Sequence, residues 1–321
     1  MLLATGLLGG LRSACPQAVI SVITSNANAV VLPLLRPEFE TYPFALTDIR
    51  GMLAHLRQRR YDLLIDTSQW ARLGALLSFF SGARVSVGFA TPGQYRHYAY
   101  THAVFHSANR HETENFLALG KVLAPGLSHK PEIAVPPSLS EACPVLPDSP
   151  YVFFHMWPAG LASHLKEWPP DYWADMAQRL TASGYTVLLT GGKADREPTD
   201  DFLARHIPES LRISAKVRSV AGRMSLPDLA WAFCRAAAVV SVNTGIMHLA
   251  ALCDAPLVAL HGPTNPQRWG PLGQRSRVLL PDSGRCAYLN LGFEYPPDAD
   301  CVMRHLPVEK VMHALRDFGV A

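Results

Sequence analysis

Hydrophobic positions in the first part of the chain fall into short continuous runs separated by longer amphipathic segments. Apolar runs of about four to eight residues are typical of buried strands, whereas longer segments with apolar positions three or four apart are typical of helices. The pattern predicts helices at Met1–Ala14, Leu46–Arg60, Ala71–Phe80 and His111–Leu123, and strands at Val19–Thr24, Tyr61–Asp66 and Val85–Phe89.

Residues 124–150 interrupt this alternation because they contain seven prolines. Proline lacks a backbone donor and disrupts helix interiors, so the stretch is typical of a stiff linker or an edge strand rather than a long helix. We place the domain boundary inside it. The prediction is a first domain at residues 1–140 and a second at residues 141–321, whose last helix can pack back on the first domain.

The alternation restarts after this linker, and the strands there are continuously apolar. Such strands are expected when helices cover both faces of a parallel sheet. The sequence thus predicts an α/β protein with two Rossmann-like, doubly wound domains, in which ligands bind beyond the carboxyl ends of the strands. The second domain is predicted to have strands at Tyr151–His155, Tyr185–Thr190, Leu211–Ser214, Val239–Val242 and Leu257–His261, and helices at Pro170–Ser183, Thr199–His206, Pro227–Ala237, Ile246–Cys253 and Leu306–Phe318.

Composition changes this picture little. The 29 Lys and Arg residues nearly balance the 26 Asp and Glu residues, which does not indicate nucleic-acid binding. The six cysteines form no C-x-x-C pair and fit reduced thiols. The apolar N-terminal run of about 11 residues is too short to span a bilayer and lacks the positive start of a signal peptide.

The most informative loop is Ser241–His248, in which a predicted strand runs directly into a helix. Asn243 or Thr244 can cap that helix, and Gly245 lets a ligand approach the backbone. Unpaired amides and the helix dipole then favour an anion, and His248 in the first turn can add a donor. An ordinary strand–helix turn with a structural histidine fits the same pattern.

Three further loops follow strands of the second domain. Lys166 is placed as a point charge for a phosphate, although this loop taken by itself favours a solvated surface lysine. Gly191 and Gly192 can pass against a flat base or ribose, but diglycine turns are common. His261–Pro266 has its shape fixed by two prolines and offers Thr264 to a ligand, or serves the structure alone.

Other chemistry is not indicated. The sequence has no G-x-S-x-G, no H-E-x-x-H and no P-loop, and no nucleophilic triad is evident. The absence of G-x-G-x-x-G argues against a dinucleotide dehydrogenase.

The loops, taken in their order, resemble those of the ADP-heptose:lipopolysaccharide heptosyltransferases and their relatives, glycosyltransferase family 9. The likeness is strongest in Ser241–Ala251 and Pro256–Pro266, followed by Trp269–Pro271. A second match runs from His155 through Lys166–Pro169 to Leu189–Gly192. The N-terminal half is generic, with weaker similarity at Tyr61–Asp66, Ser81–Phe89 and the tail Cys301–Pro307.

The resemblance implies a GT-B architecture, two Rossmann-like domains facing a central cleft. It implies an inverting, metal-independent transfer of a sugar, heptose above all, from an ADP-sugar to a lipopolysaccharide-core-type or other lipid-linked glycan acceptor, without a cofactor. Carried over, Lys166 holds the donor phosphates, and Thr244, Gly245 and His248 hold the diphosphate. The expected donor site as a whole comprises Lys166, Gly191, Gly192, Asn243, Thr244, Gly245, His248 and Thr264.

Two features depart from the family pattern. The family usually has Asp where this chain has Asn243, so donor sugar or affinity can differ. The family also opens with a strand, a glycine-rich turn and an Asp expected to act as general base, whereas Met1 already stands at the start of the following helix. We expect either that codons upstream of Met1 encode these features or that the chain is catalytically impaired. A stop codon directly upstream would exclude the first.

Two alternatives from other classes stay open. One is a non-catalytic nucleotide-sugar-binding relative, and the other is an enzyme like a sugar-nucleotide 2-epimerase. Cytosolic nucleotide sugars and inner-leaflet acceptors imply a cytoplasmic protein, expected to be a monomer, that can contact the inner membrane peripherally. The basic aromatic run Tyr95–Tyr100 with His102 can meet an anionic acceptor, or it is a solvated loop.

Overall fold

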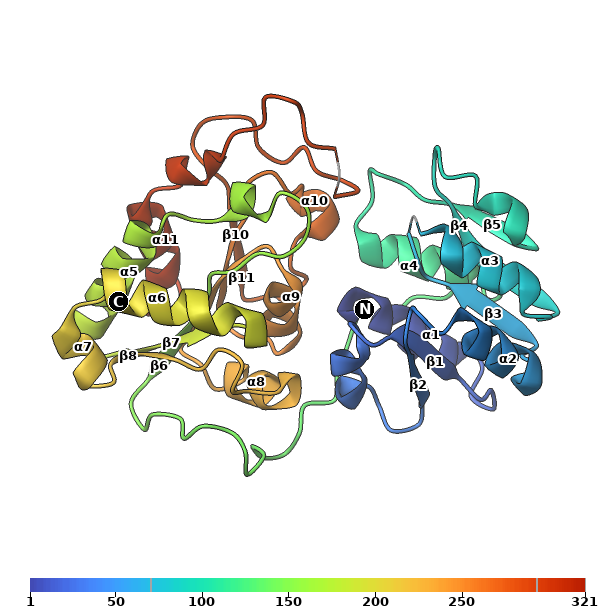
Figure 1. Cartoon of the computed structure of the whole chain (residues 1–321), viewed down its shortest axis with the longest axis horizontal. Helices are drawn as coiled ribbons and strands as arrows, with labels where there is room; N and C mark the ends of the chain where they lie inside the picture. The colour runs from blue at the N-terminus through green and yellow to red at the C-terminus, as the bar shows by residue number, and fades with distance from the viewer. Residues whose placement is uncertain (70, 293, 321) are drawn as a thin grey trace. The chain divides into compact units, whose positions relative to one another are not determined.

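The computed structural model describes residues 1–69, 71–292 and 294–320, and the chain divides into two compact units, Met1–Ala134 and Val135–Ala321 (Figure 1). The division falls inside the proline-rich stretch, and no helix or strand is formed among residues 124–150. All strand pairs in the described residues are parallel. Each unit is therefore an α/β unit.

Unit 2 is built on one six-stranded sheet with the strand order β11-β10-β9-β6-β7-β8. In sequence this is the 3-2-1-4-5-6 order of a doubly wound fold, whose direction reverses between β6 and β9. The strands are β6 (Tyr151–His155), β7 (Thr186–Thr190), β8 (Val217–Ser219), β9 (Ala238–Val242), β10 (Leu257–Leu260) and β11 (Ser276–Leu279).

Helices cover both faces of this sheet, because successive side chains of a strand point to opposite faces. On β6, Phe154 packs against Trp173 of α5, whereas Phe153 packs edge-on against Phe233 of α8. The helices of unit 2 are α5 (Pro170–Ala182), α6 (Arg196–His206), α7 (Glu209–Ile213), α8 (Leu226–Phe233), α9 (Gly245–Leu252), α10 (Pro266–Trp269) and α11 (Val308–Arg316). The last helix, α11, belongs to unit 2 and packs against α5, β10 and β11.

Unit 1 carries two separate small sheets, β1-β2 and β3-β4-β5, which are not hydrogen-bonded to each other in the described residues. Its strands are β1 (Ser21–Ser25), β2 (Glu40–Phe44), β3 (Leu63–Asp66), β4 (Val85–Ala90) and β5 (His102–Phe105). Its α-helices are α1 (Thr5–Ala14), α2 (Ile49–Arg59), α3 (Arg72–Phe80) and α4 (Glu112–Lys121). Helices α1 and α4 pack together, and Leu7 and Leu119 are buried.

The structure corrects one predicted element and adds others. The expected strand at Leu211–Ser214 is helix α7, and the strand of that region is β8. A short apolar run does not distinguish a strand from a helical turn, and here Pro208 and Glu209 open a helix. The strands β2, β5 and β11 and the short helix α10 were not predicted. Pro43 weakens the sequence signal for a strand at β2, and exposed charged or polar residues weaken it at β5 and β11.

Among the described residues, no helix combines the length and the apolar character that crossing a bilayer requires. The fold class predicted from the sequence, α/β with parallel Rossmann-like sheets, is confirmed.

Candidate functional site

The carboxyl ends of four strands in unit 2 stand in a row. His155 at the end of β6 pairs in register with Ser241 of β9 on one side and with Thr190 of β7 on the other. Leu260 at the end of β10 pairs with Val242 of β9. The four loops singled out in the sequence therefore leave the sheet side by side. Those after β6 and β9 flank the point where the winding direction reverses, which is where doubly wound sheets bind ligands.

The first turn of α9 presents unsatisfied donors at this edge. Thr244 occupies the N-cap position in an extended conformation, and its side chain does not cap the helix. Its Oγ1 is buried and has no hydrogen-bond partner among the described residues. The space above Gly245 is open, since a Cβ built there would meet nothing within 4 Å. The backbone amides, the helix dipole and this hydroxyl together suit an anion.

Lys166 lies at the end of the short 3₁₀ helix Ser163–Lys166, in the loop that follows β6. It is half-buried, and this burial lowers the pKa of its ammonium group. Within the part of the chain that the structure describes, Lys166 has no carboxylate partner, and its Nζ donates only a long bond of 3.4 Å to the Ala159 carbonyl. A partly desolvated cation without a counter-ion favours binding an anion.

Asn243 connects the ends of β9 and β10. Its Nδ2 donates to the Trp269 carbonyl of α10 at 3.2 Å and lies 3.4 Å from His261 Nε2. His261 Nδ1 in turn lies 3.3 Å from the Thr264 carbonyl, an arrangement in which Nδ1 carries the proton and Nε2 accepts. The Asn243 amide is thus directed inward and fixes the loop that carries Thr264 and α10.

Two buried histidines close the ends of strands. Burial lowers the pKa of His155, at the end of β6, to about 4, and lowers that of His261, after β10, to about 4 as well. His155 Nδ1 contacts the Thr190 carbonyl at 3.3 Å, which joins β6 to β7 at the same edge. Both imidazoles are therefore neutral near pH 7 and serve as hydrogen-bonding groups rather than as charges.

The other predicted residues have definite places. Gly191 lies against Asp195, where a Cβ would stand 2.6 Å from the Asp195 Cβ, and the Gly192 amide donates to Asp195 Oδ2 at 2.7 Å. Gly191 is therefore needed by local packing, whereas a Cβ on Gly192 would only touch Asp195 Oδ2 at 3.6 Å. Thr264 is buried and bridges to Leu289. His248 lies half-buried on the first turn of α9. Whether these residues contact a donor stays a prediction.

A buried polar network at the carboxyl edge of β3-β4-β5 in unit 1 was not predicted from the sequence. Asp66, the last residue of β3, accepts from Arg96 at 2.7 Å and from the Tyr100 hydroxyl at 2.6 Å. Nearby, fully buried Glu112 accepts from His106 at 3.0 Å. Acidic residues at the end of a strand and at the start of a helix were the available signals. Within residues 1–69, 71–292 and 294–320, no three His, Cys, Asp or Glu side chains are grouped as metal ligands.

Comparison with known proteins gives concordant matches. The model of glycosyltransferase family 9 (heptosyltransferase) matches residues 49–288, about three quarters of the chain. Lipopolysaccharide heptosyltransferase 2 of Escherichia coli (strain K12) is 29% identical over 301 residues, which cover 87% of this chain and 84% of that protein. Lipopolysaccharide heptosyltransferase 2 of Salmonella typhimurium is 36% identical over 114 residues, which cover 36% of this chain and about a third, 32%, of that protein.

A solved structure described as E. coli ADP-heptose lps heptosyltransferase II superposes on 99% of this chain and 94% of its own, with a TM-score of 0.77 and 23% identity. The fold, together with the row of strand-end loops, defines an α/β protein of the GT-B fold class. The match to the family model across most of the sequence makes the assignment specific: the chain belongs to glycosyltransferase family 9 (heptosyltransferase). The predicted family and the predicted enzyme class are thereby confirmed.

Proposed function

We propose that this chain transfers heptose from ADP-heptose to a lipopolysaccharide-core-type, lipid-linked acceptor, with inversion at the anomeric carbon and without a metal ion. In this reaction the oxygen of an acceptor hydroxyl attacks the anomeric carbon and its proton is released to solvent, while the bond from that carbon to the diphosphate breaks, so that ADP leaves. The observation that carries the proposal is the anion site at the start of α9. Among the described residues, its Thr244 hydroxyl has no hydrogen-bond partner and the space above Gly245 is open.

The chemistry of the leaving group supports this assignment. As the glycosidic bond breaks, negative charge develops on the diphosphate and must be stabilised. The first amides of α9 are preorganised donors, and Lys166, in a loop that begins beside β9, supplies a positive charge. Fixed donors in a partly desolvated site stabilise such charge without reorganisation during the reaction. These groups are suited to the role that a metal ion plays in other transferases.

The donor site is tested by replacing its cation. We expect Lys166→Ala to weaken ADP binding roughly ten- to hundredfold, because a charge-assisted contact contributes about 1.5–3 kcal/mol. Isothermal titration calorimetry with ADP and with ADP-heptose measures the effect. Lys121→Ala, which removes an exposed lysine at the end of α4 in unit 1, is the matched control and should bind as the parent does. Equal affinities of the Lys166→Ala variant and the parent would remove Lys166 from the site.

The reaction itself is tested separately with ADP-heptose and a heptose-deficient lipopolysaccharide acceptor. We expect a product heavier by one heptose, stoichiometric ADP, inverted anomeric configuration by NMR, and an unchanged rate in EDTA. Donor binding without transfer to any acceptor would indicate a nucleotide-sugar-binding relative. Interconversion of free nucleotide sugars without an acceptor would indicate an epimerase. The protein is proposed to act in the cytoplasm as a monomer.

A further inference from the structure

Helix α3 of unit 1 buries two small residues and exposes three large apolar ones, while its other two leucines, Leu73 and Leu77, are half-buried. Ala75 and Ser78 are buried against the sheet, and a Cβ on Gly74 would stand 2.5 Å from Asp66 Oδ2. By contrast, Leu76, Phe79 and Phe80 are exposed by 54%, 62% and 49%. An ordinary surface helix has the opposite arrangement, with its large apolar residues facing the core. The three exposed side chains therefore contribute little to the core of unit 1, and their apolar character points to a role at the surface.

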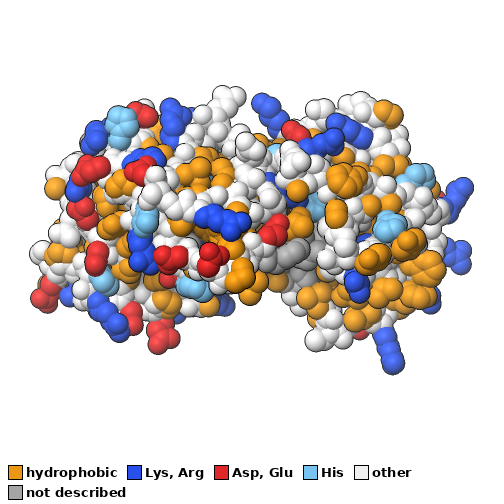
Figure 2. All heavy atoms as spheres, turned by 90° about the horizontal axis from the view of Figure 1, so that it is seen from above, with side chains coloured by type: hydrophobic (Ala, Val, Ile, Leu, Met, Phe, Trp, Pro, Cys, Tyr) orange, Lys and Arg blue, Asp and Glu red, His pale blue; other side chains and the backbone are white. Residues whose placement is uncertain are grey.

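The neighbouring 3₁₀ helix His97–Ala99 extends this face. It packs against α3, and Tyr98 is exposed by 78%, with Tyr95 exposed beside it in the sequence. Figure 2 shows hydrophobic side chains gathered over this part of unit 1, with Lys, Arg and His side chains at their margin. We call Leu76, Phe79, Phe80 and Tyr98 the α3 face. Clusters of exposed large apolar side chains mark interaction sites.

Basic residues border the α3 face at both ends. At its C-terminal end lies an open pocket of about 470 Å³ lined by Arg57, Arg60, Tyr61, Asp62, Ser81, Gly82 and Arg84. Arg57 Nε donates to the Phe80 carbonyl at 2.9 Å, which places this arginine directly beside the face. Arg72 is exposed at the N-terminal end of α3, and its Nε donates to the Gln94 carbonyl at 3.3 Å. In the described residues, Arg57, Arg60 and Arg72 have no carboxylate partner.

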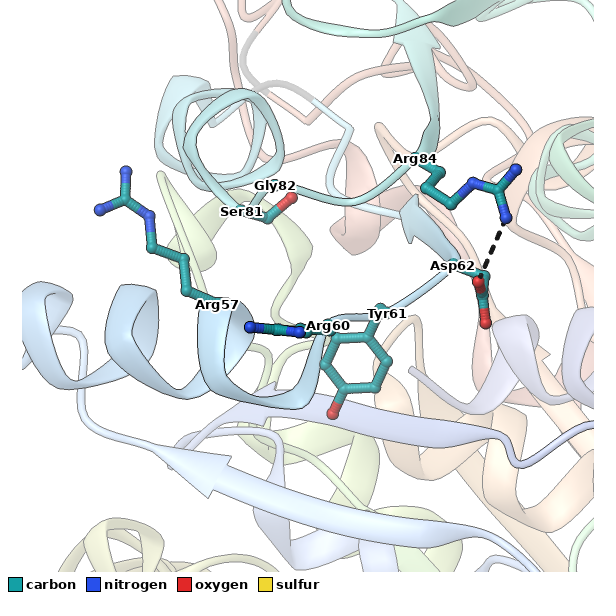
Figure 3. A pocket seen from close by; sticks show the side chains of 7 residues that line it. All are labelled: Arg57, Arg60, Tyr61, Asp62, Ser81, Gly82 and Arg84. Atoms are coloured by element: carbon teal, nitrogen blue, oxygen red, sulfur yellow. Dashed lines mark ion pairs between the residues drawn. The ribbon is translucent and has the colours of Figure 1, made fainter.

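The pocket is not shaped to hold a single anion. Figure 3 shows the side chains of Arg57 and Arg84 extending in different directions rather than toward one point, and Arg84 is paired loosely with Asp62 at 3.9 Å. The positive charge of the arginines that line the pocket is instead spread along the border of the α3 face. The same excess holds for the whole unit, since residues 1–134 contain 12 Lys and Arg against 8 Asp and Glu, whereas residues 135–321 contain 17 against 18.

We propose that the α3 face is a docking surface for a lipid bilayer with anionic headgroups. Leucine, phenylalanine and tyrosine side chains enter the headgroup–acyl boundary, while flanking arginines remain at the level of the phosphates. Charge complementarity favours this partner, because the rim is basic and, among the described residues, Arg57, Arg60 and Arg72 have no carboxylate partner. A second copy of the chain would bring an equally basic rim against it. This inference does not rest on the proposed transfer reaction.

The test uses flotation of the full chain with two sets of vesicles, one of phosphatidylcholine and one containing roughly 30% phosphatidylglycerol. We expect the parent to bind the anionic vesicles, and to bind less at 0.5 M salt than at 0.1 M, because salt screens surface charge over about 10 Å or less. The variant Leu76→Ser/Phe79→Ser/Phe80→Ser should lose binding by roughly tenfold or more. Arg60→Gln/Arg84→Gln should bind weakly and lose its preference for anionic vesicles.

Matched controls remove similar groups elsewhere. Val145→Ser/Ile213→Ser deletes two residues of unit 2 exposed by 84% and 79%, and Arg212→Gln deletes an exposed arginine of unit 2. Both should float as the parent does, and circular dichroism with thermal melting checks that every variant is folded. Absence of parent binding, equal binding by the triple serine variant, or equal binding to neutral vesicles would overturn the proposal. So would light scattering that shows a parent dimer and a monomeric triple variant, because a second copy would then cover the face.

Discussion

At the scale of single residues, the side-chain amide of Asn243 makes contacts that the Asp usual in the family could not make. It stands where the family usually has Asp, yet its amide donates to the Trp269 carbonyl and lies beside an acceptor nitrogen of His261. A carboxylate cannot donate either bond. The environment of Asn243 therefore requires a donor, and this requirement follows from the neighbours rather than from the ligand.

Asn243→Asp tests this requirement. We expect the free energy of unfolding to fall by about 1–3 kcal/mol at pH 8, because a carboxylate oxygen would face the Trp269 carbonyl. The loss should shrink toward pH 5, where His261 can take a proton and pair with the new carboxylate. Urea unfolding at both pH values measures it, with exposed Asn109→Asp as the isosteric control. An equal loss at both pH values would contradict the role of His261.

At the scale of elements, β6 ends in a buried histidine and β10 is followed directly by another. Both imidazoles are neutral in the folded protein near pH 7. The pKa of His155 and that of His261 both lie near 4 because of burial, whereas histidine in an unfolded chain titrates near 6.5. The unfolded state therefore binds more protons than the folded state between these values. The contribution of these two histidines to the free energy of unfolding is fully present above about pH 6.5 and is lost as the pH falls toward 4.

This linkage predicts the acid sensitivity of the protein. Between pH 6 and 4.5 the free energy of unfolding should fall by up to about 1.4 kcal/mol per pH unit for each of the two histidines. His155→Gln should flatten the slope measured by urea unfolding, and exposed His313→Gln should leave it unchanged. Parallel slopes for the parent and for His155→Gln would show that His155 is not a source of the acid sensitivity.

At the scale of the whole molecule, the two units differ in how continuous their sheets are. Unit 2 has one continuous six-stranded sheet with buried strands and helices on both faces, and unit 1 has two sheets that share no hydrogen bonds in the described residues. The part of the linker after Ala134 belongs to unit 2, where Ser140 bonds to Asp228 of the α8 capping box and the Val145 carbonyl accepts from Arg218. Whether a preceding strand completes unit 1 stays a prediction.

Unit 2 should therefore fold by itself. We expect residues 135–321, expressed alone, to melt cooperatively and to bind ADP within roughly threefold of the full chain, since a domain with its own core folds independently. Differential scanning calorimetry of the fragment measures the melting transition, and isothermal titration calorimetry measures its affinity for ADP. Lys166→Ala in the fragment should weaken ADP binding as it does in the full chain. A fragment that melts cooperatively but does not bind ADP would show that the proposed donor site is not contained in unit 2.

The sequence determined the parallel α/β class, the linker and most elements of unit 2, because continuous apolar strands and periodic helices leave a local signal. It also identified Ser241–His248 by its strand–turn–helix order. Periodicity failed at α7, β2 and β11, where short segments depend on their neighbours. Only the tertiary structure decided that the four loops leave the sheet in one row, that the Thr244 hydroxyl lacks a partner among the described residues and that α3 exposes Leu76, Phe79 and Phe80. These facts depend on strand order and packing between residues distant in sequence, which local patterns do not encode.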